Sequence, residues 1–295
     1  MYTSLLALAC NVFLNWVFMF GNLGVPAFGA VGCGMASAVT VWLTAIVLGG
    51  YISMAKVYRP LKIFAHFSPM RLPVLKELIA LGMPIAVTIT AEAGLFSAIS
   101  ILVGTRGVEI TAAHQISLNF AGTMFMIPLA FSAATTVRTG HALGSGNVAE
   151  ARMAGMTGIL MCALFMTFSA TFLLLFRDVV VGIYTNDPQV MEIAISLLLM
   201  AAVFQIADGV QIGAAGALRG YKDTRIPMVI NTFSYWALGF PLAYLAAIVF
   251  QAPPSYIWGG FVLGLSVAAV LLTIRFERLS RTPDQVDRGR LWKGG

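Results

Sequence analysis

The chain consists of long apolar stretches separated by short polar segments. Eight stretches reach the roughly 20 mostly apolar residues that a bilayer crossing requires. They lie at about residues 2–20, 29–54, 78–103, 112–137, 154–176, 190–218, 228–250 and 256–274. Their alanine, leucine and glycine content favours helices over the alternating strands of a membrane barrel. The pattern predicts an all-α membrane protein with eight transmembrane helices.

Composition supports this prediction. Of the 295 residues, 59% are hydrophobic and 10% are charged, whereas soluble domains carry about 25% charged residues. A water-soluble fold of this size could not cover so much apolar surface. A soluble protein is therefore excluded, and the lipid bilayer is the expected environment.

The basic residues indicate how the chain is oriented. All but Arg106 and Arg177 of the 18 lysines and arginines fall in alternate loops and in the C-terminal segment. The positive-inside rule places these loops and both ends of the chain in the cytoplasm. This distribution also explains the net charge of +6 without a nucleic-acid partner.

Motifs for metals, nucleotides and catalysis do not stand out. The three cysteines lie in apolar stretches without framework spacing, and the three histidines share no ligand spacing with them. The glycine-rich residues 140–146 lack the Gly-Lys-Ser/Thr ending of a phosphate-binding loop. No nucleophile–base pair is visible. We therefore expect no cofactor, no nucleotide and no enzymatic activity.

An internal repeat predicts the domain organisation. The pattern Asn-x-Phe-x-x-Trp occurs at residues 11–16 and again at 231–236, and Ser-x-x-x-Val-x-Leu-Thr follows at 37–44 and 266–273. Duplicated halves are common in transporters, so the first two helices correspond to the last two. On this interpretation roughly four helices of a parent with about twelve are missing before the first one.

The repeat assigns each part of the chain to a bundle. The expected parts are the last two helices of an incomplete N-terminal bundle (1–57), a cytoplasmic linker (58–77), a complete six-helix bundle (78–275) and a basic cytoplasmic tail (276–295).

Several segments resemble the multidrug and toxic-compound extrusion (MATE) family. They are IPLAFSAATTVRTGHALGSGN at 127–147, LRGYKDTR at 218–225, LGMP at 81–84 and AHQI at 113–116. The likeness is greatest to the bacterial branch with sodium-coupled members, which implies the inner membrane. It further implies two six-helix bundles around a cavity that opens alternately to either side. A secondary antiporter of this kind exports amphipathic organic cations in exchange for sodium ions or protons.

Two acidic residues, Glu92 and Asp208, lie deep within the predicted spans. A charge at a helix centre costs about 2.5–3.5 kcal/mol on insertion scales, so such residues usually face a protein interior or a wet cavity. A proton or a sodium ion could neutralise them. Both match acidic positions of the family, which implies a coupling-ion site at Glu92 and Asp208. The alternative is that both carboxylates are structural and hydrogen-bonded between helices.

Polar neighbours extend this predicted site. Three residues surround Asp208 at i−4, i−3 and i+3, and the first of them, Phe204, could offer its ring to a cation. Thr88 shares a helix face with Glu92, and the fourth span carries a shorter polar stripe. Amides also serve as contacts between helices. The predicted cavity residues are Glu92, Asp208, Phe204, Gln205, Gln211, Gln115, Asn119 and Thr88.

Other polar and small residues are expected to be structural. Residues 219–225, which include Arg219, Lys222, Asp223 and Arg225, should form a cytoplasmic elbow that anchors neighbouring helices. The Gly-x-x-x-Gly pairs at 209–213 and 260–264 should allow close helix contact, and His114 should be a packed residue.

Two alternatives to antiport stay open. The first is a lipid-linked precursor flippase of related architecture, which should carry several basic residues within its spans to hold phosphates. The sequence has none at the span centres. The second is a fragment that does not transport.

Overall fold

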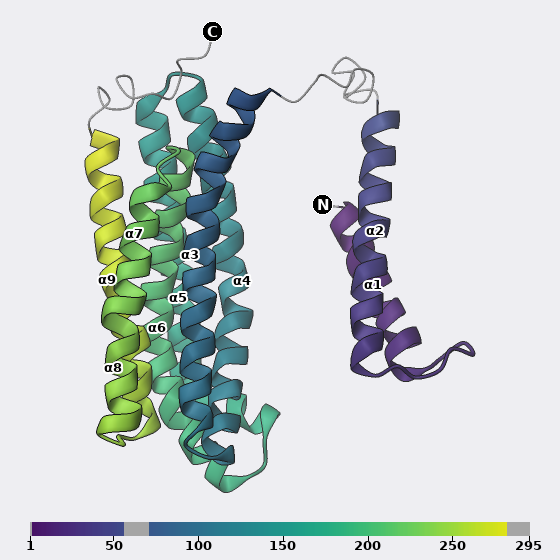
Figure 1. The fold of residues 1–295 in the computed structure, drawn as a ribbon, viewed down its shortest axis with the longest axis vertical. Coiled ribbons are helices and arrows are strands. Elements are labelled where there is room, and N and C mark those ends of the chain that lie inside the picture. Colours follow the sequence, from purple (N-terminus) through teal and green to yellow (C-terminus); the bar gives the residue numbers. More distant parts are fainter. Residues whose placement is uncertain (1, 56–70, 282–295) are drawn as a thin grey trace. The chain divides into compact units, whose positions relative to one another are not determined.

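The computed structural model describes residues 2–55 and 71–281, and these form helices joined by short turns (Figure 1). Eight helices within these residues are long and apolar enough to cross a membrane, which confirms the predicted fold class. One of the eight, Arg225–Val249, contains two π-helical segments. The elements are α1 (Tyr2–Phe20), α2 (Ala30–Met54), α3 (Leu72–Gly104), α4 (Val108–Gly144), α5 (Val148–Tyr184), α6 (Pro188–Gly220), α7 (Arg225–Phe233), η2 (Ser234–Gly239), α8 (Phe240–Tyr244), η3 (Leu245–Val249) and α9 (Pro254–Arg281).

Several helices are longer than the apolar stretches that predict them. Helix α3 begins at Leu72, inside the predicted linker 58–77, and α9 continues to Arg281, inside the predicted tail 276–295. Their added turns carry charges such as Lys76 and Glu277. Helical backbone can continue beyond the apolar core, where water solvates such charges, so hydropathy alone misses these turns. Residues 56–70 and 282–295, which include most of the predicted linker and tail, lie outside the described residues.

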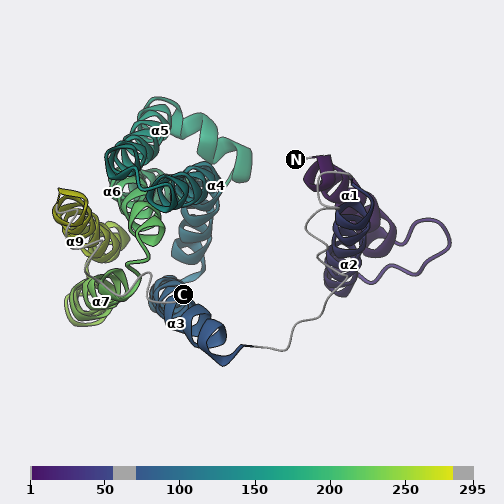
Figure 2. The ribbon, with the colours of Figure 1, turned by 90° about the horizontal axis from the view of Figure 1, so that it is seen from above.

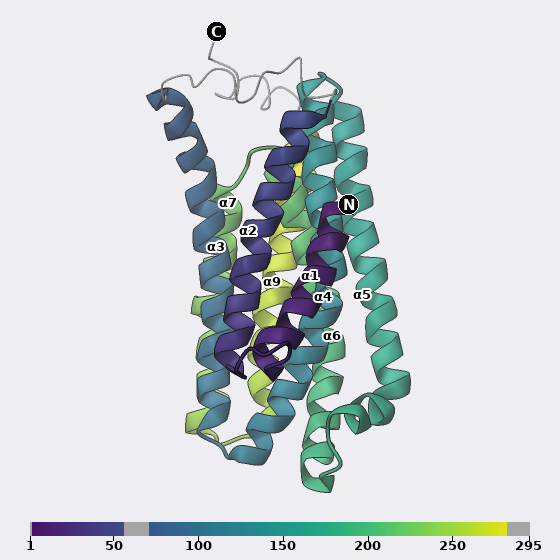
Figure 3. The same ribbon diagram turned by 90° about the vertical axis from the view of Figure 1, so that its right-hand side faces the viewer.

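The chain divides into two compact units, residues 1–71 and 72–295. In the first unit, α1 and α2 form an antiparallel pair (Figure 3). The Asn11 amide donates to Thr40 Oγ1 at 3.3 Å, and a Cβ at Gly32 would lie 2.9 Å from Met19 N. The two backbones therefore approach closely where the small residue lies.

Helix α6 is the centre of the second unit and packs against α4, α5 and α9 (Figure 2). Small residues make these contacts close. A Cβ at Gly209 would lie 2.6 Å from Met166 Cγ, and one at Gly213 would lie 3.0 Å from Ile159 Cα. Ser132 on α4 also donates to the Ile212 carbonyl at 2.7 Å. The predicted close contact at the first glycine pair is confirmed.

The second glycine pair brings α9 against the π-helical part of its neighbour. A Cβ at Gly260 would lie 2.6 Å from Gly239 O, and one at Gly264 would lie 3.0 Å from Ser234 O. Both contacts are to backbone atoms of η2, so the two helices touch without intervening side chains. The predicted close approach is confirmed here as well.

Ion pairs tie the turn between α6 and α7 to other helices. Lys222 Nζ lies 2.9 Å from Glu77 Oε1 on α3, and Arg275 Nε on α9 lies 2.8 Å from Asp223 Oδ2. The predicted anchoring role is thus confirmed for Lys222 and Asp223. For Arg219 it was wrong, because this side chain turns into the cavity described next.

Candidate functional site

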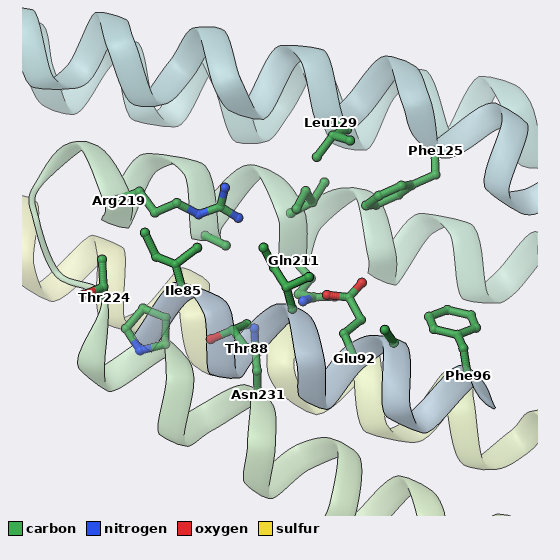
Figure 4. A pocket seen from close by; sticks show the side chains of 15 residues that line it. Ile85, Thr88, Glu92, Phe96, Phe125, Leu129, Gln211, Arg219, Thr224 and Asn231 are labelled. Carbon is green, nitrogen blue, oxygen red and sulfur yellow. The ribbon is translucent and has the colours of Figure 1, made fainter. Parts of the chain in front are cut away.

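A cavity of about 360 Å³ lies in the second unit between α3, α4, α6 and α7 (Figure 4). This volume is in the range of small-molecule sites. The lining is mostly apolar, with Glu92 as its one carboxylate and Arg219 as its one cation. The lining residues are Ile85, Thr88, Ile89, Glu92, Ala93, Phe96, Phe125, Leu129, Gln211, Ile212, Ala215, Arg219, Thr224, Pro227 and Asn231.

Glu92 projects into this cavity from α3, and η2 fixes the helix beside it. The Trp236 indole N–H donates to the carbonyl of Ala91 at 3.1 Å. A Cβ at Gly94 would lie 3.1 Å from the same indole ring. The absence of a side chain at Gly94 therefore lets the indole lie on α3, two residues along the chain from Glu92.

Replacing Trp236 by Phe should weaken this attachment of α3. The phenyl ring keeps most of the apolar contact but loses the hydrogen bond, so we expect a loss of about 1 kcal/mol in stability. Thermal unfolding in detergent micelles measures it. Trp42→Phe, at an exposed position in the first unit, is the control. Equal unfolding midpoints for the two variants would contradict the assigned role of Trp236.

Asp208 lies behind the cavity wall on α6. Its side chain is 4% exposed and makes no hydrogen bond with residues 2–55 or 71–281. It interacts electrostatically with Glu92. One turn further on, the Gln211 amide lines the cavity and donates to the Tyr235 hydroxyl, while its oxygen lacks a partner among the described residues. Two carboxylates and two uncharged oxygens are thus gathered in one region of the bundle.

Three comparisons relate this arrangement to known proteins. The MatE family matches residues 84–245, which is more than half of the chain. A probable multidrug resistance protein NorM of Xanthomonas campestris is 42% identical over 268 residues, covering 91% of this chain and 58% of that protein. The multidrug resistance protein MdtK of Photorhabdus laumondii is 37% identical over 290 residues, covering 97% and 64%. The chain belongs to the MatE family.

A solved structure shares the fold. The crystal structure of the eukaryotic MATE transporter AtDTX14 superimposes with a TM-score of 0.82 at 23% identity, covering 97% of this chain and 64% of that one. The MatE family consists of transporters rather than enzymes, so this chain is a multi-pass inner-membrane protein of a transporter family. It spans 58–64% of the length of the NorM and MdtK relatives given above.

The structure of this MatE chain brings half of the predicted site together. Glu92, Thr88 and Gln211 line the cavity, and Asp208 lies behind it. Phe204 instead forms T-shaped contacts with the rings of Phe96, Phe261 and Trp258, with centroids 5.8–6.0 Å apart. It is buried in this aromatic cluster and does not line the cavity.

Three predicted amides lie elsewhere. Gln205 accepts a hydrogen bond from Ser169 on α5 at 2.6 Å. Gln115 and Asn119 line a separate hollow with Tyr184, whose hydroxyl donates to Asn119 at 2.9 Å. At 100° per residue, i−3 and i+3 fall about 60° to opposite sides of Asp208. Gln205 therefore faces α5 while Gln211 faces the cavity.

Sequence reasoning missed several residues of the cavity. The aromatic rings in it are those of Phe96 and Phe125, and its further polar groups are those of Arg219, Thr224 and Asn231. Phe96 lies one turn after Glu92, and Asn231 begins the repeated Asn-x-Phe-x-x-Trp pattern. These two features of the sequence could have drawn attention to Phe96 and Asn231, but neither feature by itself indicates that the side chain faces a cavity.

His114 is a packed residue, as predicted. The Trp258 indole N–H donates to His114 Nδ1 at 3.1 Å, and His114 Nε2 lies 3.0 Å from Ser100 Oγ. Ser100 in turn donates to the Phe96 carbonyl at 2.8 Å, so Nε2 must carry the hydrogen. Among the described residues, no group of three or more His, Cys, Asp or Glu side chains is placed to hold a metal ion.

Proposed function

We propose that this chain belongs to a secondary antiporter that exports amphipathic organic cations in exchange for sodium ions or protons. The observation that carries the proposal is a single carboxylate, Glu92, in a largely apolar cavity with the buried Asp208 behind it. The multidrug resistance names of the NorM and MdtK relatives support it.

The coupling ion binds between the two carboxylates. Hard cations prefer oxygen ligands, and Glu92, Asp208 and the unpartnered oxygen of Gln211 supply them. A bound sodium ion or proton removes the repulsion between the two acids. An organic cation at Glu92 would do the same, because its positive charge also neutralises the site. The ion and the substrate therefore compete for one carboxylate, which is the condition for exchange.

The apolar part of the cavity binds the rest of the substrate. The rings of Phe96 and Phe125 lie together on one side of Glu92 in Figure 4, and aromatic rings attract organic cations. Antiport agrees better with this lining than the flipping of a lipid-linked precursor does, because a phosphate site needs several cations and this cavity has Arg219 alone.

The proposal also includes the orientation of the chain in the membrane and the incomplete N-terminal helix bundle. The end of the six-helix unit that carries Lys222 and Arg275 is cytoplasmic by the positive-inside rule, and so are both chain ends. Alternating access uses a second bundle, of which α1 and α2 are the last two helices. A segment of roughly four further helices completes that bundle.

Competition between ion and substrate can be measured on this chain directly. We expect rhodamine 123, an amphipathic cation, to bind the purified chain in lipid nanodiscs, with its affinity reduced about 5- to 150-fold by saturating sodium. Fluorescence anisotropy measures the affinity, and N-methylglucamine replaces sodium at constant ionic strength in the control. If protons are the coupling ions, lowering the pH should reduce the affinity for rhodamine 123, and sodium should not. An affinity that responds to neither ion would contradict the proposal.

A further inference from the structure

A groove of about 380 Å³ lies between α4 and α5, which pack side by side (Figure 2). It shares no residue with the cavity that contains Glu92. The buried Thr135 and Gly158 form its floor, since a Cβ at Gly158 would overlap the Thr135 side chain. The exposed Met153 and Met161 line it from α5, and methionine side chains adapt readily to an apolar ligand. We refer to this feature as the α4–α5 groove.

The two ends of the α4–α5 groove differ in polarity. At one end the ring of Phe131 meets Phe165 edge to face, with centroids 6.5 Å apart. At the other end lie the only charged residues of its lining, Arg138 and Glu150. At 1.5 Å per residue, the groove runs about 10 Å along α4 from Arg138 to Phe131 and about 16 Å along α5 from Glu150 to Met161. One leaflet of hydrocarbon is about 15 Å thick, so the groove matches the length and polarity of a lipid chain.

The charged end of the groove offers both a donor and an acceptor. Arg138 Nη2 donates to Glu150 Oε1 at 3.3 Å, and the two side chains are 72% and 37% exposed. This is the one hydrogen bond of the guanidinium with residues 2–55 or 71–281, although it has five N–H donors. The other oxygen, Glu150 Oε2, accepts from Asn147 at 3.2 Å, so each carboxylate oxygen keeps a free lone pair. Exposed ion pairs contribute little stability, and a ligand can therefore bind to both groups at little cost.

The position of this pair agrees with the level of lipid headgroups. Helix α4 has 37 residues and is about 55 Å long, which exceeds the hydrocarbon thickness of about 30 Å. Arg138 lies within two turns of the end of α4, and Glu150 lies in the first turn of α5. Both are at the end of the unit that the positive-inside rule assigns to the cytoplasm. The groove thus leads from the cytoplasmic headgroups into the hydrocarbon.

From this arrangement we propose that the α4–α5 groove binds one phosphatidylethanolamine molecule of the cytoplasmic leaflet. The lipid phosphate accepts hydrogen bonds from the free N–H groups of Arg138, and the ammonium group donates to Glu150. One acyl chain lies on the floor formed by Thr135 and Gly158. Thr135 does not need a polar ligand there, because its hydroxyl donates to the Phe131 carbonyl at 2.8 Å.

The carboxylate of Glu150 determines which headgroup fits. Every phospholipid offers a phosphate to Arg138, but only some offer a partner to the neighbouring carboxylate. The ammonium of phosphatidylethanolamine has three N–H donors, as a lysine ammonium has. The trimethylammonium of phosphatidylcholine has none, and the headgroup of phosphatidylglycerol has no positive charge and would bring its phosphate close to a like charge. Phosphatidylethanolamine therefore complements both members of the pair.

The rival occupant of the groove is a helix, either of a second copy of the chain or of a segment outside the described residues. Its side chains could fill the apolar part of the groove. A helix in the groove would exclude lipid, however, and binding would then not depend on the headgroup. Headgroup selectivity therefore separates the two interpretations.

Native mass spectrometry of the detergent-solubilised chain can measure this selectivity, because it resolves each bound lipid by mass. The probes are dioleoyl phosphatidylethanolamine, phosphatidylcholine and phosphatidylglycerol. We expect the first bound phosphatidylethanolamine to have an affinity about three- to tenfold higher than the other two, as for a charge-assisted hydrogen bond at a half-exposed position. Glu150→Gln keeps the size of the side chain but removes its charge. It should abolish this preference and should not weaken the binding of phosphatidylcholine.

Additional variants test the other parts of the site. Arg138→Met removes the phosphate donor and should weaken all three lipids. Ala154→Phe adds a ring to a lining residue and should also weaken all three, because it fills the space for the acyl chain. The matched control is Arg177→Met with Asp178→Asn, which removes another exposed ion pair, 3.9 Å long, near the other end of α5. It should change none of the affinities. Size-exclusion profiles identify any variant that is not folded.

Several outcomes would overturn the lipid site. The wild-type chain could bind the three lipids equally, or Glu150→Gln could keep the preference for phosphatidylethanolamine. A preference that the control at Arg177 and Asp178 also loses would show that the selectivity does not arise in the groove. Unchanged lipid binding by Ala154→Phe would mean that the acyl chain lies elsewhere. Dimers that Ala154→Phe dissociates, without bound lipid in the wild type, would identify a second copy of the chain as the occupant.

Discussion

Neutralising both acids together, as Glu92→Gln and Asp208→Asn, is expected to abolish ion-dependent cation binding. The amides keep the size of the side chains, but they remove the charges that attract sodium, protons and the organic cation. Removing a charge-assisted contact costs about 1.5–3 kcal/mol, so rhodamine 123 affinity should fall at least about tenfold. The remaining affinity should respond neither to sodium nor to pH, because the ionisable groups are gone. Fluorescence anisotropy in nanodiscs measures both effects.

A control for this variant must lose the same net charge elsewhere. Glu109→Gln with Asp178→Asn does so at two exposed positions of the same unit, and it should bind like the wild type. The double variant should still insert into the membrane, since neutral side chains are less costly there than charged ones. Undiminished, ion-dependent binding by the double variant would mean that the carboxylates are structural, as the alternative interpretation holds.

The long apolar stretches made most of the fold predictable. A membrane allows few solutions for a chain of this hydropathy, because each backbone polar group must be bonded within its helix. What hydropathy could not predict is detail that depends on packing. The π-helical η2 exists where Gly239 meets Gly260 of α9. The first turns of α3 carry charged residues that hydropathy does not assign to a span, and one of them, Glu77, pairs with Lys222.

The candidate site was predictable only in part, for a physical reason. A charge in a span is costly wherever it lies, so Glu92 and Asp208 are conspicuous in the sequence. Uncharged and aromatic residues have no such cost, and only the direction of the side chain decides their role. Phe204 and Phe96 are equal as sequence features, yet Phe96 alone of the two lines the cavity. Arg219 was expected outside because the position of its Cα does not reveal where its long stem reaches.

Replacing Gly260 by Leu should disrupt the six-helix unit more than any other single change considered for this chain. Its Cβ would lie 2.6 Å from Gly239 O and 3.0 Å from Ala243 N, and backbone atoms cannot rotate away as side chains do. The α9 and η2 backbones must therefore separate. Overpacking of this kind costs about 1–3 kcal/mol and sometimes more. Thermal unfolding in detergent micelles should show a marked fall in the unfolding midpoint.

The same substitution should also impair the cavity, although Gly260 does not line it. Displacing η2 moves Trp236, which bonds to Ala91 beside Glu92, so rhodamine 123 affinity should fall as well. Gly259→Leu is the matched control, because it adds the same side chain to the preceding residue, where a Cβ meets nothing within 4 Å. It should leave stability and binding near their wild-type values. Equal effects of the two variants would show that added bulk or hydropathy on α9, rather than the contact with η2, is responsible.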